Sequence, residues 1–213
     1  MHRTVEAELL DSLPPQAPAA LRSRRDLGLI NSVMGNRAWF RRVLPELTRP
    51  GERVLEIGAG DGGLARRLRP EVPHSDGLDL WPRPPDWPRT DRWHQEDVRQ
   101  FRGWDAYAVV FGNLICHHFP DSTLAGLGAA IRRHARVFAA SEPARGRRYQ
   151  LLFSLLCPLI RAHEVTRHDG RASIAAGFAD DELPRIMGFF SADWTCRVRT
   201  TPLGAYRLIA LRP

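Results

Sequence analysis

The sequence contains no lysine, and only three of its 213 residues are cysteine. The cysteines are far apart, so their spacing matches neither a metal site nor a disulfide framework. Residues 1–10 lack the basic flank and apolar core of a secretory signal. The longest apolar run, Leu151 to Ile160, is interrupted by Ser154 and Pro158 and is well short of the roughly 20 residues that span a bilayer. These absences predict a cytoplasmic protein without a membrane span.

The net charge is positive, and arginine supplies every basic side chain. The formal net charge is +7, with 31 basic residues. Such a charge suits a nucleic-acid partner. The arginines, however, are spread from Arg3 to Arg212 rather than gathered in one block. A genome-wide coding preference explains this bias as readily as a binding surface does, so nucleic acid is the less favoured partner.

Short apolar runs alternate with amphipathic stretches through the middle of the chain. We expect strands at 54–57, 75–80, 92–95, 106–111 and 137–141, and helices at 62–69 and 122–133. This alternation predicts an α/β fold with a mostly parallel sheet and helices on both faces. One connection departs from the pattern, because the proline-rich residues 81–88 cannot form a regular helix.

The segments on either side of this region differ in character. Residues 1–20 are rich in proline and small residues and are expected to be an irregular lead-in. Two helices are predicted next, Leu21 to Met34 with Gly35 as its stop, and Ala38 to Leu44 ending before Pro45. We therefore divide the chain into an N-terminal helical cap and lead-in, residues 1–50, and an α/β domain, residues 51–213.

The C-terminal third is expected to contain a helical insertion near 145–178. Within it, Arg145 to Ile160 predicts a helix broken near Pro158, and the polar residues 163–176 are expected to lead to a last helix around 180–187. Two final strands, 194–200 and 206–211, are joined by a turn and predict an antiparallel hairpin at the sheet edge.

A glycine-rich turn follows the first predicted strand. It reads Glu56-Ile57-Gly58-Ala59-Gly60-Asp61-Gly62-Gly63. Glycine lets the chain turn sharply and lets a ligand approach the backbone, while the following helix offers unpaired N–H groups at its start. The pattern therefore predicts a site for a nucleotide-type cofactor.

Three acidic positions accompany this turn. Glu56 precedes the first glycine, Asp79 ends the second strand 21 residues after Gly58, and Asp97 follows the third strand. A carboxylate at Asp79 can accept two hydrogen bonds from a ribose diol. Asp97 is placed where an adenine amino group could be recognised.

With these residues, the chain resembles the class I S-adenosylmethionine-dependent methyltransferases of the bacterial small-molecule type. Glu56 to Gly62 matches the E-x-G-x-G-x-G first motif of that family, and Asp79, Asp97 and Asn113 match its second, third and fourth positions. The resemblance implies a Rossmann-like, doubly wound sheet with an antiparallel C-terminal hairpin. It implies S-adenosyl-L-methionine as the cofactor. The implied cofactor contacts are Glu56, Gly58, Ala59, Gly60, Asp79, Leu80, Asp97, Val98 and Asn113.

The same turn also satisfies the dinucleotide pattern G-x-G-x-x-G through Gly58, Gly60 and Gly63, so an NAD enzyme is an alternative. Glu56 argues against it, because a carboxylate suits a cationic ligand better than a pyrophosphate.

Two adjacent histidines follow the fourth strand. His117 and His118 come just after Asn113, at the carboxyl edge where such folds bind ligands. Methylation of a hydroxyl requires loss of a proton, and an imidazole can accept it near neutral pH. His118 or His117 is therefore the candidate base or substrate-orienting group. The alternative is a structural histidine that donates to a backbone carbonyl.

A second group of residues lies at His163 to Asp169, followed by Arg171 and Ser173. Similar small-molecule methyltransferases have a matching segment before the last helix, so His163 or His168 is an alternative base. The two histidines are five residues apart rather than four, and no metal is predicted. The resemblance also makes the helix with Arg25 to Asn31 a candidate wall of the substrate pocket.

The leading hypothesis is methylation of a small, aromatic or lipophilic acceptor in secondary metabolism, most favourably at oxygen. An RNA methyltransferase and a non-catalytic S-adenosylmethionine-binding protein are the alternatives. Against RNA, Gly112 to Ile115 lacks the Asn/Asp-Pro-Pro-aromatic signature that stacks a flipped base. The apolar residues 151–156 suit contact with the acceptor or with a second subunit of a homodimer.

Overall fold

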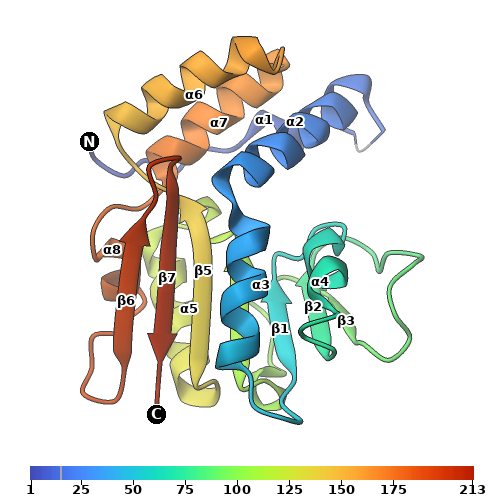
Figure 1. The fold of residues 1–213 in the computed structure, drawn as a ribbon, viewed down its shortest axis with the longest axis vertical. Helices are drawn as coiled ribbons and strands as arrows, with labels where there is room; N and C mark the ends of the chain where they lie inside the picture. Colours follow the sequence, from blue (N-terminus) through green and yellow to red (C-terminus); the bar gives the residue numbers. More distant parts are fainter. Residues whose placement is uncertain (15) are drawn as a thin grey trace.

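A seven-stranded sheet forms the centre of the computed structural model, which describes residues 1–14 and 16–213 (Figure 1). The strands are β1 (Val54–Ile57), β2 (Ser75–Asp79), β3 (Trp93–Gln95), β4 (Val109–Asn113), β5 (Val137–Pro143), β6 (Thr195–Thr200) and β7 (Ala205–Leu211). Their order is β3-β2-β1-β4-β5-β7-β6. Strands β1 to β5 run parallel, and β7 pairs antiparallel with both β5 and β6. The predicted fold class and the C-terminal hairpin are confirmed.

The register brings the ends of the central strands to one edge. Ile57 of β1 pairs with Leu78 of β2 on one side and with Gly112 of β4 on the other. All residues of β1 and β5 are buried, as expected of parallel strands that helices cover on both faces. The segments that follow β1, β2 and β4 therefore begin side by side, where ligands bind in open α/β sheets.

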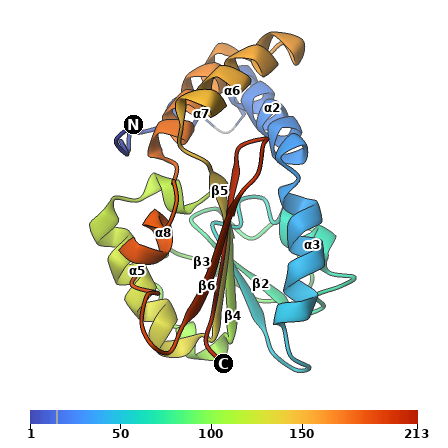
Figure 2. The same ribbon diagram turned by 60° about the vertical axis from the view of Figure 1, so that its left-hand side comes forward.

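Helices cover the two faces of the sheet and enclose two apolar cores (Figure 2). On one face lie α3 (Asn36–Leu47) and α4 (Gly63–Leu68), with Phe40 and Leu44 packed in the same core as Val54 and Phe111. On the other face lie α5 (Asp121–His134) and α8 (Glu182–Ile186), with the short 3₁₀ helix η1 (Trp104–Ala106) beside α5. A second 3₁₀ helix, η2 (Cys116–His118), follows β4.

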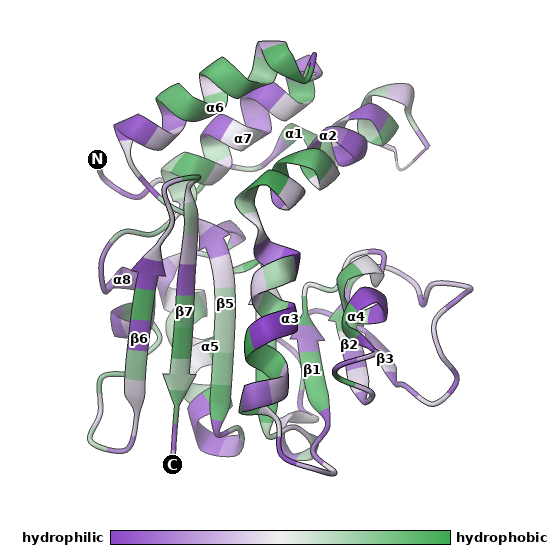
Figure 3. Cartoon of the chain, viewed as in Figure 1, coloured by the Kyte–Doolittle hydropathy of each residue, from purple (hydrophilic) through white to green (hydrophobic). Residues whose placement is uncertain are grey.

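Four further helices lie above the carboxyl edge of the parallel strands (Figures 1 and 2). They are α1 (Leu9–Ser12), α2 (Pro18–Met34), α6 (Arg147–Leu159) and α7 (Glu164–Ala176). We call them the helical cap. Apolar residues recur along α2 and α6 as well as in the strands (Figure 3). Among the described residues, no helix combines the length and apolar character needed to cross a bilayer.

One predicted helix end at a proline is wrong, because α3 continues through Pro45 to Leu47. Helix α6 ends at Leu159, one residue after Pro158, in agreement with the predicted break near that proline. Both prolines lie in the last turn, where each removes one N–H bond but interrupts only the end of the helix. In α3, burial of Phe40, Val43 and Leu44 holds the helix on the sheet.

The expectation of an irregular lead-in is also wrong, because residues 1–20 contain α1 and the first turn of α2; residue 15 lies outside the described part. The polar residues 164–176, which lie in the segment expected to be a helical insertion, form α7. The polar side chains of α7 are stabilised by partners from elsewhere. Asp26 of α2 accepts hydrogen bonds from Thr166 Oγ1 at 3.0 Å and from the His163 N–H at 2.8 Å. By contrast, residues 80–92 contain no helix, as their prolines predict.

Candidate active site

The glycine turn after β1 has the backbone conformation that its sequence requires. Gly58, Gly60 and Gly62 have φ of 67°, 57° and 69°, in the left-handed region that side chains disfavour. A Cβ atom at Gly58 would lie 2.5 Å from Ile115, so glycine is needed there for packing. A Cβ atom at Gly60 would meet nothing within 4 Å. The turn is therefore packed at Gly58 and open at Gly60, which leaves its backbone accessible.

Asp79 lies directly against this open turn. Its Oδ2 accepts a hydrogen bond from the Gly60 N–H at 2.7 Å, and its Oδ1 accepts one from the Trp81 N–H at 2.9 Å. Each carboxylate oxygen can accept a further bond. The structure thus brings together the predicted cofactor residues at the ends of β1 and β2.

Glu56 lies beneath the turn rather than at its mouth. Its side chain is buried, and Oε2 accepts a hydrogen bond at 3.1 Å from the N–H of Ala65, in the first turn of α4. Burial raises the pKa of Glu56 well above its usual value, and the nearby carboxylates of Asp61 and Asp79 add to this effect. This carboxyl group therefore supports the start of α4, and a cation bound above the turn would favour its ionised form.

The segments after β2 and β3 form the edge of the site. Leu80 is 67% exposed and Val98 is buried. The guanidinium of Arg24, from the helical cap, lies 4.9 Å from the centre of the Trp81 ring. Asp97 forms an ion pair with Arg99 and accepts its backbone N–H at 2.9 Å. Leu80 and Trp81 thus offer apolar surface next to Asp79.

Amide side chains connect α3 to the end of β4. Asn36 Nδ2 donates to Asn113 Oδ1 at 3.0 Å. Among the described residues, the buried Oδ1 atoms of Asn36 and Asn31 have no hydrogen-bond partner. A buried oxygen without a partner is costly and marks a place for a donor. Together with the open turn at Gly60 and the carboxylate of Asp79, these oxygens fit a ligand with an amino group and a ribose.

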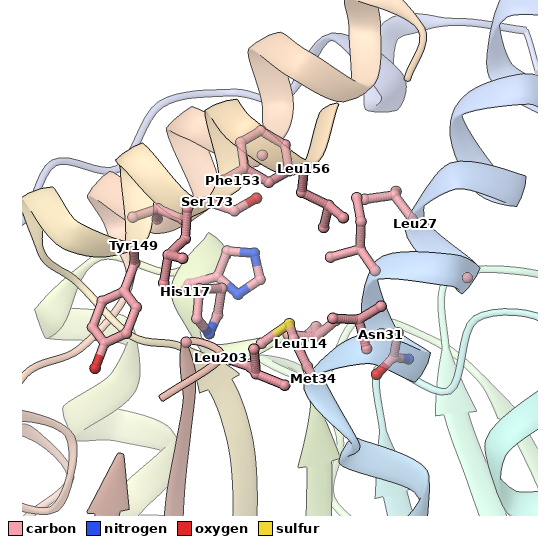
Figure 4. A pocket seen from close by; sticks show the side chains of 18 of the residues that line it. Leu27, Asn31, Met34, Leu114, His117, Tyr149, Phe153, Leu156, Ser173 and Leu203 are labelled. Carbon is pink, nitrogen blue, oxygen red and sulfur yellow. The ribbon is translucent and has the colours of Figure 1, made fainter. Parts of the chain in front are cut away.

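An apolar cavity of about 500 Å³ lies between the helical cap and the carboxyl edge (Figure 4). Leu27, Phe153 and Leu156 point into it from the cap, Met34 lies at the C-terminal end of α2, and Leu114 lies on the side of the carboxyl edge (Figure 4). Leu114 neighbours Ile115, whose side chain packs against Gly58. The cavity wall at Leu114 is therefore one residue away from a contact with the glycine turn.

His117 forms part of the polar corner of this cavity and faces two carboxylates. Its Nδ1 is 2.7 Å from Glu142 Oε2, and its Nε2 is 3.6 Å from Glu8 Oε1. Burial alone would lower the pKa of His117, but hydrogen bonds to Glu142 and Glu8 raise it to about 9. Glu142 is itself fully buried and also accepts the N–H groups of Ile115 and Cys116. His117 is accordingly an imidazolium at neutral pH.

His118 lies against His117, but its pKa is shifted in the opposite direction. The two ring centres are 4.2 Å apart. Burial, followed by the charge of His117, lowers the pKa of His118, so this ring is neutral at pH 7. His118 also lines the cavity. The side chains of Glu8, His117 and His118 bring ligand atoms within 4.8 Å of one another, which is close enough to hold a metal ion.

The other two predicted histidines lie away from this cavity. His163 is the N-cap of α7, where its Nδ1 accepts the Val165 N–H at 3.3 Å. The side chain of His168 is 49% exposed and pairs with Asp169. Neither residue is among those that line the cavity. Of the four predicted histidines, the structure brings only His117 and His118 to it.

Two residues of the site are not predicted by the sequence patterns. Glu142 lies near the end of the fifth strand and is followed by proline, a position at the carboxyl edge that could have been recognised. Glu8 comes from the expected lead-in, and no local pattern places it next to His117.

Comparison with known proteins identifies the family. The family model described as "Methyltransferase domain" matches residues 33–145, more than half of the chain. No curated protein sequence shows a significant match.

Solved structures of methyltransferases share the fold. The plantazolicin methyltransferase BamL, in complex with a triazolic desmethylPZN analog and SAH, superposes with a TM-score of 0.71 at 10% identity, covering 95% of this chain and 92% of that one. Magnesium protoporphyrin IX methyltransferase (ChlM) from Synechocystis PCC 6803, with bound SAH, gives 0.55 at 16% identity over 88% and 84%. The pyocyanin biosynthetic protein PhzM gives 0.62 at 16% identity over 97% and 62%. The chain belongs to the methyltransferase-domain family, and its methyl donor is S-adenosylmethionine.

Proposed function

We propose that this protein methylates a hydroxyl oxygen on a small acceptor with an aromatic or lipophilic body. The observation that carries this proposal is the apolar cavity of about 500 Å³, which has His117 and His118 at its polar corner and Leu114 beside the glycine turn. Its size suits a small molecule. Solved structures with the same fold support this substrate class, since the plantazolicin methyltransferases bind desmethylPZN analogs.

The proposed donor site follows the carboxyl ends of β1 to β4. The backbone of Gly58, Ala59 and Gly60 would hold the methionine part, above the carboxyl group of Glu56. Asp79 would bind the ribose, because its carboxylate already lies against the turn. The donor supplies a methyl group on a positively charged sulfonium.

The remaining donor contacts are proposed around the adenine. Leu80 and Val98 would enclose the ring, and Asp97 would accept from its amino group. Asn113 is held by Asn36 at the end of β4. It would define the boundary between the donor and the acceptor.

Within the acceptor site, we assign the proton-accepting role to His118. A base must be neutral before it can take a proton, and the lowered pKa of His118 keeps it neutral. His117 is unsuited to this role because both of its ring nitrogens already face carboxylates. The apolar walls from α2 and α6 exclude water and orient the acceptor body.

Calorimetry tests the donor site. We expect S-adenosylmethionine and S-adenosylhomocysteine to bind and NAD not to bind. Gly60→Arg should abolish binding, because it places a side chain in the open space over the turn. Gly51→Arg is the matched control, since Gly51 also has a positive φ and open surroundings but precedes β1 at the opposite edge of the sheet. Binding of NAD alone would contradict the proposed function.

A further inference from the structure

The first twelve residues form a strap across the polar corner of the cavity. The Arg3 guanidinium donates to the carbonyls of Ala176 and Phe119, each at 2.8 Å. Further along, the N–H groups of Leu9 and Leu10 donate to the two carboxylate oxygens of Asp169, at 2.8 and 2.9 Å. The strap is therefore attached both to η2 and its following loop and to α7.

Between these two attachments the strap brings one side chain into the cavity. The Glu8 side chain is 10% exposed and lines the cavity beside His117. Its Oε1 accepts a hydrogen bond from Ser173 Oγ and lies 3.6 Å from His117 Nε2. A carboxylate costs free energy when buried, so its placement here requires a charged or donating partner.

The geometry around His117 fixes its charge. A neutral imidazole has one N–H, whereas His117 faces the Glu142 carboxylate at Nδ1 and the Glu8 carboxylate at Nε2. Glu8 Oε1 also accepts from Ser173 Oγ and, at 3.6 Å, lies beyond a normal hydrogen bond to Nε2, so it favours the doubly protonated ring through its negative charge. If Glu142 were the only carboxylate facing the ring, a single N–H at Nδ1 would be enough. Glu8 therefore determines whether the second nitrogen carries a proton.

Other charged groups around the two histidines are few. Asp11 of the strap acts on both rings, and Arg3 donates to the backbone carbonyl of His117 at 3.4 Å. Asp169 of α7 is already bound to the strap N–H groups and to His168. Glu8 is thus the partner of His117 Nε2 that can be removed without disturbing Glu142.

We propose that Glu8 is a positioning residue of the acceptor site, which keeps His117 charged and leaves its neighbour His118 as the neutral proton acceptor. This inference rests on the proposed function. It defines the site more narrowly: the hydroxyl of the acceptor is expected to meet the neutral His118 ring, next to the carboxylate–imidazolium–carboxylate chain, while its apolar body fills the cavity.

Nuclear magnetic resonance titration of the full chain, labelled with ¹⁵N-histidine, tests the inference. The signals of His117 and His118 are assigned with His117→Gln and His118→Ala. In Glu8→Gln we expect the deprotonation midpoint of His117 to fall by about one pH unit or more, as for loss of an adjacent opposite charge. The exposed Glu6→Gln is the matched control and should leave the midpoint unchanged, while Glu8→Asp should restore part of the shift.

Two results would overturn the inference. One is an unchanged His117 midpoint in a folded Glu8→Gln variant. The other is a stoichiometric metal ion in the purified protein whose binding is lost in Glu8→Gln, since His117 Nε2 would then be a ligand. If Glu8→Gln does not fold, Arg3→Ala loosens the strap and should shift the midpoint in the same direction. The titration needs neither donor nor acceptor. Failure of the proposed function, seen in calorimetry as the absence of S-adenosylmethionine binding, is therefore distinguishable from failure of this inference, seen as an unchanged His117 midpoint.

Discussion

Two adjacent histidines have opposite protonation because their surroundings differ. Carboxylates face both ring nitrogens of His117, whereas His118 has the charged His117 ring as its neighbour. Protonation of the first ring disfavours protonation of the second. The pair therefore combines a ring that is charged at neutral pH with a neutral ring that can accept a proton.

Removal of the neutral ring should affect turnover and not donor binding. With a panel of alkyl- and arylphenols, we expect His118→Ala to lower S-adenosylhomocysteine release about 10²- to 10⁴-fold, the usual contribution of a general base. His168→Ala, outside the cavity, should leave the rate unchanged. In the unmodified protein the rate should fall only below about pH 6.5, because the pKa of His118 is lowered from that value. A rate lost in His168→Ala and kept in His118→Ala would assign the base to His168 instead.

The sequence predicts some of these residues better than others. The glycine turn and Asp79 follow directly from a local motif and from strand ends, so their proximity could be expected. The sequence also places His117 and His118 at the carboxyl edge. It cannot distinguish between them, because Glu8 and Glu142 reach His117 through tertiary folding.

Among the elements, α7 shows why a helix of polar residues is difficult to delimit from its sequence. It buries Thr166, Asp169 and Gly170 as well as apolar residues. These polar groups are satisfied by α2 and by the strap, which lie far from α7 in sequence. Hydrophobic periodicity does not detect a helix whose buried face is stabilised in this way. The central strands, by contrast, are buried on both faces, and their predicted ranges agree with the structure within a few residues.

The close packing of α5 against the end of α8 can be tested by substitution of glycine residues in α5. A Cβ atom at Gly128 would lie 2.2 Å from the carbonyl oxygen of Met187, whereas one at Gly126 would meet nothing within 4 Å. We expect Gly128→Ala to lower the free energy of unfolding by about 1–3 kcal/mol through overpacking. Gly126→Ala in the same helix should raise it by about 0.5–1 kcal/mol. Urea denaturation measures both, and equal effects would contradict the close approach of Gly128 to Met187.

For the whole molecule, the buried chain of Glu8, His117 and Glu142 links stability to pH. The pKa of His117 is raised from 6.5 to about 9. The contribution of its protonation to the free energy of unfolding is therefore complete below pH 6.5 and is lost as the pH rises through 9. Hydrogen bonds to His117 outweigh burial and lower the pKa of Glu142 and of Glu8, so their contributions are present above about pH 4.5 and are lost in acid.

Unfolding in urea at pH 6 and pH 9 measures this linkage. We expect the free energy of unfolding to fall by up to about 3 kcal/mol between these values, the equivalent of a shift of two pKa units or more. His117→Gln should remove most of this dependence. A dependence that persists unchanged in the variant would place its origin elsewhere.

The division between the donor and acceptor sites has an evolutionary consequence. The matched family region, residues 33–145, contains every strand end proposed to hold the donor, whereas α6, α7 and most of α2 lie outside it. Exchange of α6 and α7 would therefore change the apolar walls of the cavity and leave the proposed donor loops and His118 in place. Chimeras that replace residues 147–176 with the equivalent segment of another such enzyme are a direct route to altered selectivity.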